Sequence, residues 1–134
     1  MDVVIDTNIL VSALWSVNGS PAAFVGMVLT GKLTPCYDYR IIDEYIRVLR
    51  RPKFKFTEGE IGALLGWIED YGKSVVTNPC TEVFIDESDR KFYEVAKYCN
   101  AILVTGNKKH FPDDPLVKTV NEFLSLWMSS NGGI

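Results

Sequence analysis

The sequence contains little histidine and cysteine. Its 134 residues include one histidine, His110, and three widely spaced cysteines, Cys36, Cys80 and Cys99, without a Cys-x-x-Cys pair. These numbers argue against a zinc site with the usual Cys and His spacing and against a disulfide framework. We expect the three cysteines to be reduced thiols, mostly buried, as is usual in the cytoplasm.

Long hydrophobic runs and an excess of one charge are also missing. No apolar run approaches the roughly 20 residues that span a bilayer. The first predicted strand begins so close to Met1 that we expect no signal peptide. A formal net charge of -3 does not suggest a chain that coats nucleic acid, so any phosphate contact must come from a local patch. The composition therefore predicts one soluble, cytoplasmic domain that does not associate with a membrane.

Strand-like and helix-like segments alternate along the chain. Strands are predicted near residues 3–5, 33–37, 74–77, 101–105 and 116–120, and helices over 9–15, 20–30, 40–50, 57–71, 86–98 and 121–128. This alternation favours an α/β fold with a parallel sheet covered by helices on both faces. We expect one domain over residues 1–128 and a disordered tail over 129–134.

Asp6 ends the first apolar run and is followed by Thr7 and Asn8. In open parallel α/β sheets, ligands bind outside the carboxyl ends of the strands. A carboxylate is costly to bury there unless it is paired or holds a cation. Asp6 is therefore the first candidate for a functional residue.

Two further acids are predicted to face the same region. Glu44 falls at the margin of the apolar arc of its helix, beside Val48, where the alternative is a solvated border residue. Asp89 lies on the apolar stripe of the helix predicted over residues 86–98, whereas Asp86 or Ser88 is expected to cap that helix. We assign Asp89 to the site, although Asp86 and Asp89 are able to exchange these roles.

Thr105 and Asn107 follow the second strongly apolar strand and flank Gly106. They offer oxygen ligands at the sheet edge that carries Asp6, although an ordinary strand-to-loop turn has the same composition. Carboxylates gathered within a few ångströms repel one another and favour a hard divalent cation. Oxygen donors without a His and Cys set indicate Mg²⁺ or Mn²⁺.

A basic segment over residues 47–56 interleaves five cations with Phe54 and Phe56. This pattern suits phosphates and stacked bases, and a solvated helix end is the alternative. The candidate RNA-binding residues in this segment and after the site loop are Arg47, Arg50, Arg51, Lys53 and Lys108. The sequence has more large apolar residues than the predicted buried faces of its helices and strands require. We expect most of these residues to lie in the core: Leu14, Trp15, Phe24, Trp67 and Trp127.

Four stretches together resemble the PIN-domain family of ribonucleases and, within it, VapC-type toxins. They are VVIDTNILV (residues 3–11), DEYIRVLRRPKF (43–54), DESDRKF (86–92) and VTGNK (104–108). The likeness covers almost the whole chain in order. It implies a three-layer α/β/α sandwich around a parallel sheet, with a Mg²⁺ or Mn²⁺ site that cleaves single-stranded RNA.

The resemblance also implies roles for individual residues. The acidic metal ligands fall on Asp6, Glu44 and Asp89, and Thr105 takes the place of a small hydroxyl residue at the site. The usual fourth acid falls on Asn107, whose amide carbonyl can bind a cation but adds no negative charge. Toxin-like relatives also imply a homodimer and an inhibitory antitoxin protein as partners.

Other functions remain as alternatives. A catalytically weakened PIN-like module that binds RNA or protein would follow from the loss of the fourth acid at Asn107. A haloacid-dehalogenase-like phosphatase needs a second aspartate where Asn8 stands, and a phospho-receiver domain needs an acidic pair at the first strand. These departures make both of the last two functions weaker interpretations than a nuclease.

Overall fold

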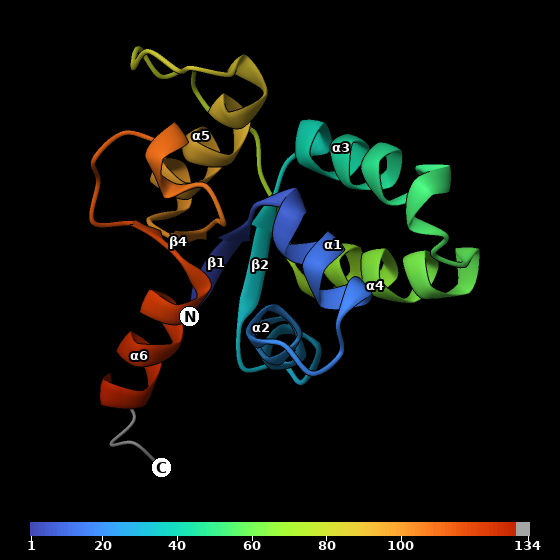
Figure 1. The fold of residues 1–134 in the computed structure, drawn as a ribbon. Helices are drawn as coiled ribbons and strands as arrows, with labels where there is room; N and C mark the ends of the chain where they lie inside the picture. The colour runs from blue at the N-terminus through green and yellow to red at the C-terminus, as the bar shows by residue number, and fades with distance from the viewer. Residues whose placement is uncertain (131–134) are drawn as a thin grey trace.

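A five-stranded parallel sheet forms the centre of the protein in a computed structural model that describes residues 1–130 (Figure 1). The strands lie in the order β3-β2-β1-β4-β5. Their bounds are β1 (Asp2–Ile5), β2 (Thr34–Tyr37), β3 (Lys73–Ser74), β4 (Ile102–Val104) and β5 (Val117–Lys118). The central strand β1 is lined by the fully buried Val3, Val4 and Ile5, as expected for a strand covered on both faces.

Within residues 1–130, six α-helices and three short 3₁₀ helices accompany the sheet. The α-helices are α1 (Thr7–Trp15), α2 (Ser20–Leu29), α3 (Tyr39–Leu49), α4 (Glu58–Tyr71), α5 (Arg90–Cys99) and α6 (Val120–Ser130). The 3₁₀ helices are η1 (Pro52–Phe54), η2 (Glu87–Asp89) and η3 (Lys108–His110). Helix α5 contacts β1, β2 and β4 from one face, whereas α1 and α2 lie on the other face and α6 packs against α2 (Figure 1). The predicted three-layer α/β/α sandwich is therefore confirmed.

The strand order reverses between β1 and β4. From β1 the chain proceeds to β2 and β3 on one side and then crosses to β4 and β5 on the other side. Ligands in doubly wound sheets bind at such a switch point, outside the carboxyl ends of the two strands. Ile5 pairs in register with Val104, so the residues that follow them, Asp6 and Thr105, meet at this point.

Several boundaries differ from those the sequence predicts. The segment predicted as one helix over 86–98 begins with η2, because Asp86 accepts hydrogen bonds from Ser88 and tightens the first turn. The strand predicted over 74–77 overlaps the two-residue β3 only at Ser74. Helix α6 continues to Ser130, two residues past its expected end, and the rest of the predicted disordered tail, residues 131–134, lies outside the described residues.

A capping box begins α4 as predicted. The Thr57 hydroxyl accepts a hydrogen bond from the Glu60 amide, and the Glu60 carboxylate accepts one from the Thr57 amide. A reciprocal pair of this kind satisfies two amides at a helix start that have no partner within the helix. Thr119 and Glu122 repeat the arrangement at α6, which replaces the Asn121 start expected from the sequence.

Within residues 1–130 no single helix is long and apolar enough to cross a membrane. Helices α1 and α2 meet that criterion only as a pair, by length and composition, and a bend of 105° separates them.

Candidate active site

The site begins where β1 and β4 end. Asp6 is only 6% exposed, and its Oδ2 accepts a hydrogen bond from the Thr105 hydroxyl at 2.7 Å. The Asn107 amide donates in turn to Thr105 Oγ1 at 3.0 Å, which fixes the orientation of the hydroxyl. Burial raises the pKa of Asp6 to about 6, against the opposing effect of the Thr105 hydrogen bond and with a further increase from Asp89 and Glu44. A positive ligand would therefore be favourable at this carboxylate.

Glu44 reaches the same region from α3. The helix is anchored beside β1, because the buried Tyr45 hydroxyl donates to the Ile5 carbonyl oxygen. Glu44 then accepts a hydrogen bond from the Thr7 hydroxyl through Oε2 and pairs with the Lys91 ammonium through Oε1 at 2.7 Å. The Glu44 side chain is only 13% exposed and that of Lys91 only 11% exposed. Glu44 thus lies at the inner margin of its helix, as predicted.

Asp89 has an unsatisfied oxygen. Among the side-chain nitrogen and oxygen atoms of residues 1–130, Asp89 Oδ2 is the buried one without a hydrogen-bond partner. His110 Nδ1 lies 3.6 Å away, which is beyond hydrogen-bond reach. Burial and the neighbouring Asp86 raise the pKa of Asp89. Asp86 caps η2, as we favoured from the sequence, and it also lines the same pocket as Asp89.

These groups line one pocket of about 320 Å³. Its lining comes from the ends of β1 and β4, from α3 and from the start of α5, and includes every predicted site acid. Thr105 is fully buried behind Asp6 and does not itself line the pocket. The lining residues are Asp6, Thr7, Asn8, Glu44, Arg47, Val48, Arg51, Asp86, Ser88, Asp89, Lys91, Asn107 and His110.

The pocket is lined by the carboxylate and amide oxygens that a hard cation prefers, but the Lys91 ammonium pairs with one of these carboxylates, that of Glu44. Within residues 1–130 no three Asp, Glu, His or Cys side chains are gathered closely enough to hold a metal ion as they stand. Lys91 occupies one oxygen of Glu44, whereas Asp89 keeps Oδ2 unpartnered and Asp6 is held by a single hydroxyl. Asp6 and Asp89 therefore fit a divalent cation, and Glu44 fits once Lys91 moves away from it.

The predicted RNA-binding residues divide into two groups. Arg47 and Arg51 line the pocket. Arg50 instead pairs with Glu58 at 3.1 Å, Lys108 pairs with Glu122 at 3.0 Å, and Lys53 lies over the Phe54 ring. The last three residues therefore lie outside the lining of the pocket.

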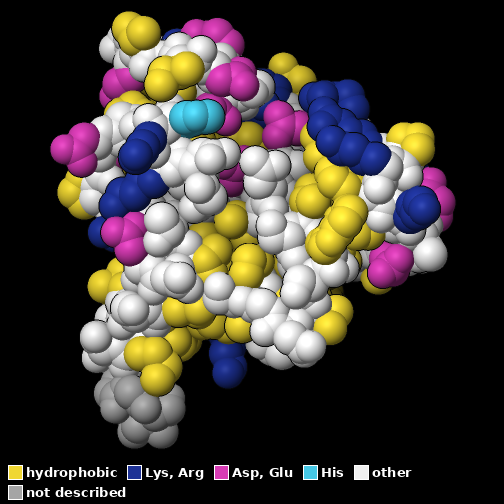
Figure 2. All heavy atoms as spheres, in the orientation of Figure 1, with side chains coloured by type: hydrophobic (Ala, Val, Ile, Leu, Met, Phe, Trp, Pro, Cys, Tyr) yellow, Lys and Arg dark blue, Asp and Glu magenta, His cyan; other side chains and the backbone are white. Residues whose placement is uncertain are grey.

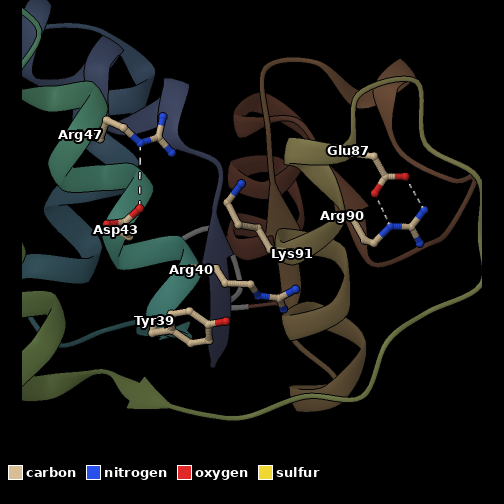
Figure 3. Close-up of a pocket in the computed structure, with 7 residues that line it drawn as sticks. All are labelled: Tyr39, Arg40, Asp43, Arg47, Glu87, Arg90 and Lys91. Atoms are coloured by element: carbon tan, nitrogen blue, oxygen red, sulfur yellow. Dashed lines mark hydrogen bonds and ion pairs between the residues drawn. The ribbon is translucent and has the colours of Figure 1, made fainter.

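A groove of about 630 Å³ lies beside the pocket, between α3 and the start of α5 (Figure 3). Arg47 and Lys91 line both cavities. In Figure 3, Arg90 is paired with Glu87 on one side of the groove and Arg47 with Asp43 on the other, and Lys91 extends between the two helices.

Lys91 is the site residue that the sequence reasoning missed. It follows Asp89 by two residues and lies one helical turn before the fully buried Val95. A lysine at that position on α5 must direct its stem along the protein interior, which is a signal that helix phase alone could have supplied.

Comparisons with known proteins agree with this geometry. The PIN domain family matches residues 2–109. The chain is also 33% identical, over 109 residues, to the uncharacterized protein MJ1680 of Methanocaldococcus jannaschii. That alignment covers 79% of this chain and 70% of the relative. PIN domains are generally nucleases and typically use divalent metal ions. On the family match and the strand-end carboxylates, the chain belongs to the PIN domain family.

Proposed function

We propose that this PIN domain is a divalent-metal-dependent endoribonuclease that hydrolyses phosphodiester bonds in single-stranded RNA. One observation carries the proposal: buried Asp6, with its raised pKa, shares a pocket with Asp89, whose Oδ2 lacks a partner. Buried acids without a cation are unfavourable, so an arrangement of this kind is suited to a ligand that supplies positive charge.

Asp6 and Asp89 would hold a Mg²⁺ or Mn²⁺ ion. When bound, the ion would supply Lewis acidity that activates water and balances charge on the phosphate. Thr105 orients Asp6 through its hydroxyl, and Thr7 orients Glu44 in the same way. Glu44 would accept a hydrogen bond from the attacking water and so align it with the phosphorus atom.

Lys91 and Asn107 would complete the site. Lys91, once released from Glu44, carries an ammonium within the pocket that is suited to a non-bridging phosphate oxygen. Asn107 offers an amide oxygen where related sites carry a fourth acid, so we expect the affinity for divalent ions to be modest.

The direct test is cleavage of an end-labelled single-stranded RNA by the purified protein. We expect cleavage in Mn²⁺ or Mg²⁺, none in EDTA, and recovery when the metal is restored. The same sequence as single-stranded DNA should be cut more slowly. RNA binding without cleavage at any metal concentration would contradict the nuclease and support the binding-module alternative.

We also propose that the enzyme is the toxin of a toxin–antitoxin pair, acts as a homodimer and is inhibited by an antitoxin. The resemblance to VapC-type proteins supports this role, and the Lys91–Glu44 contact supports a basic side chain as the inhibitory group. Induced expression of the chain alone should halt bacterial growth. Normal growth in the presence of an active, soluble enzyme would contradict the toxin role.

A further inference from the structure

The C-terminal end of α1 exposes a large aromatic residue beside two others. Trp15 is 62% exposed, although the sequence led us to expect it in the core together with Phe24, which is fully buried. The rings of Phe54 and Phe56 contact Trp15 edge to face, at centroid distances of 5.7 and 6.2 Å. Phe54 and Phe56 are half-buried, and Phe56 packs against the core, so the rings form a supported cluster with Trp15 as its exposed member. An exposed aromatic ring on such a support is typical of a binding surface.

The backbone builds this cluster from distant parts of the chain. Lys55 adopts a left-handed conformation with φ of 57°, and this bend allows Phe54 and Phe56 to stack at 5.5 Å with an interplanar angle of 15°. Trp15 then covers both rings from α1. We call Trp15, Phe54 and Phe56 the aromatic platform.

Positively charged residues adjoin the aromatic platform. The chain has no acidic residue between Tyr45 and Thr57, whereas it has Arg51, Lys53 and Lys55 close to the two phenylalanines. The Lys53 ammonium lies 5.2 Å from the centroid of the Phe54 ring. Figure 2 shows Lys and Arg side chains gathered over α3 next to a hydrophobic patch. Cations beside exposed rings are the combination that binds unpaired bases together with their phosphates.

The platform is also continuous with the acidic pocket. Asn8, Ser12 and Trp15 are exposed at i, i+4 and i+7 of α1, so they form one stripe along the helix. Asn8 lines the pocket, and the rise from Asn8 to Trp15 is about 10 Å, or about three stacked nucleotides. Arg51 lines the pocket as well and precedes η1, which carries Phe54.

We infer that the aromatic platform is a base-stacking subsite that holds an unpaired nucleotide of a single-stranded RNA about three nucleotides from the cleavage position. The inference rests on the proposed function for its substrate, but it concerns binding rather than cleavage. Stacking is sequence-tolerant, since every base presents a π-face. The subsite therefore selects for unpaired strands rather than for a particular base.

The test measures binding in EDTA, where no cleavage is expected. Fluorescence anisotropy would give the affinity of an eight-nucleotide oligouridylate for the wild type, for Trp15→Ala and for Trp15→Phe. We expect Trp15→Ala to weaken binding by about 5- to 100-fold and Trp15→Phe to restore most of it. Tyr98→Ala is the matched control, because Tyr98 is 57% exposed and belongs to α5, away from the platform.

An abasic oligomer with the same number of phosphates separates stacking from charge. Trp15→Ala should bind this oligomer as the wild type does. Equal affinity of Trp15→Ala and wild type for oligouridylate, or an equal loss with the abasic oligomer, overturns the inference. Unchanged RNA binding together with a change in self-association would assign the surface to a protein partner and overturn it as well.

The two proposals fail separately. Binding that depends on Trp15 without metal-dependent cleavage supports the subsite and contradicts the nuclease. Metal-dependent cleavage with binding that is independent of Trp15 supports the nuclease and contradicts the subsite.

Discussion

Asp38 and Glu94 bury their carboxylates between α3 and α5, as Asp6 does at the end of β1, but their surroundings differ. Arg40 donates to Asp38 Oδ2 at 2.6 and 2.9 Å and to Glu94 Oε1 at 2.8 Å. The amides of Arg40 and Ile41 satisfy the other oxygen of Asp38, and the Cys80 amide satisfies the other oxygen of Glu94. Every oxygen of this pair therefore has a donor.

Two of the pocket acids, Asp6 and Asp89, lack such a full set of partners. Burial would raise the pKa of Glu94, but the Cys80 amide and Arg40 outweigh it, so the pKa lies below its usual value. The pKa of Asp6 is raised to about 6, and Asp89 Oδ2 has no donor. Buried acids that have all their partners stabilise the fold, whereas buried acids without them indicate a place where a ligand supplies the missing charge.

The largest expected effect is on cleavage by Asp6→Asn. An amide adds no negative charge for a divalent ion, so we expect activity to fall by more than about 100-fold. Stability should change in the other direction. The raised pKa of Asp6 means that its ionisation opposes folding as pH rises from 3.8 through about 6. Above that range the metal-free variant should be more stable than the wild type, by up to about 3 kcal/mol.

Cleavage assays and urea denaturation in EDTA would check both parts. Asp43→Asn is the matched control, because the Asp43 side chain is 77% exposed on the same helix as Glu44. A folded Asp6→Asn protein that retains metal-dependent cleavage would remove Asp6 from the site. A strong loss of stability in Asp6→Asn would show that Asp6 stabilises the fold as Asp38 and Glu94 do, and would contradict the difference argued above.

Glu94→Gln should have the opposite pattern. The change removes one of the two carboxylates that Arg40 bonds and leaves Asp38 as its ionic partner. The lost charged hydrogen bonds should make unfolding easier by about 2–3 kcal/mol. Because the pKa of Glu94 is lowered in the folded state, its contribution is present above pH 4.5 and is lost as pH falls further. Urea denaturation as a function of pH should therefore show a flatter acid limb for the variant.

Activity per folded molecule should be unchanged by Glu94→Gln, since Glu94 does not line the pocket. Glu87→Gln is a suitable control, because the Glu87 side chain is 72% exposed and its loss should change stability by less than about 0.5 kcal/mol. A stable Glu94→Gln protein with impaired cleavage would show that the buried network belongs to the site.

Much of the fold and the positions of the pocket acids could be predicted from local sequence patterns. The apolar run before Asp6 predicted a strand that ends on a carboxylate. Helix phase placed Glu44 at the margin of a buried face and Asp89 on the apolar stripe of its segment. Strand alternation predicted the parallel sheet and its two helical layers. Each of these inferences depends on residues that are near one another in the chain.

Contacts between distant segments could not be predicted in the same way. Arg40 meets Glu94 across 54 residues, and Trp15 meets Phe54 across 39 residues of sequence. Such contacts depend on how α3, α5 and η1 are placed in space, and neither helix phase nor charge pattern contains that information. The Lys91–Glu44 pair is the same kind of contact within the pocket.

Lys91→Gln should produce the smallest of these effects. It tests most directly whether a pocket acid that loses its partner binds a metal ion more tightly. Lys91 gives Glu44 a permanently charged partner at 2.7 Å, whereas Asp89 Oδ2 has only His110 Nδ1 nearby, at 3.6 Å. The Lys91 ammonium therefore competes with a divalent ion for the pocket. Removing it should tighten Mn²⁺ binding by about fivefold to tenfold in calorimetric titrations, since a nearby positive charge is lost. Cleavage should become slower, because the phosphate loses a cationic contact. Lys97→Gln is the control, because Lys97 pairs with Asp114 at a similar distance of 2.8 Å outside the pocket. Unchanged Mn²⁺ affinity in Lys91→Gln would mean that Glu44 is not part of the ion site.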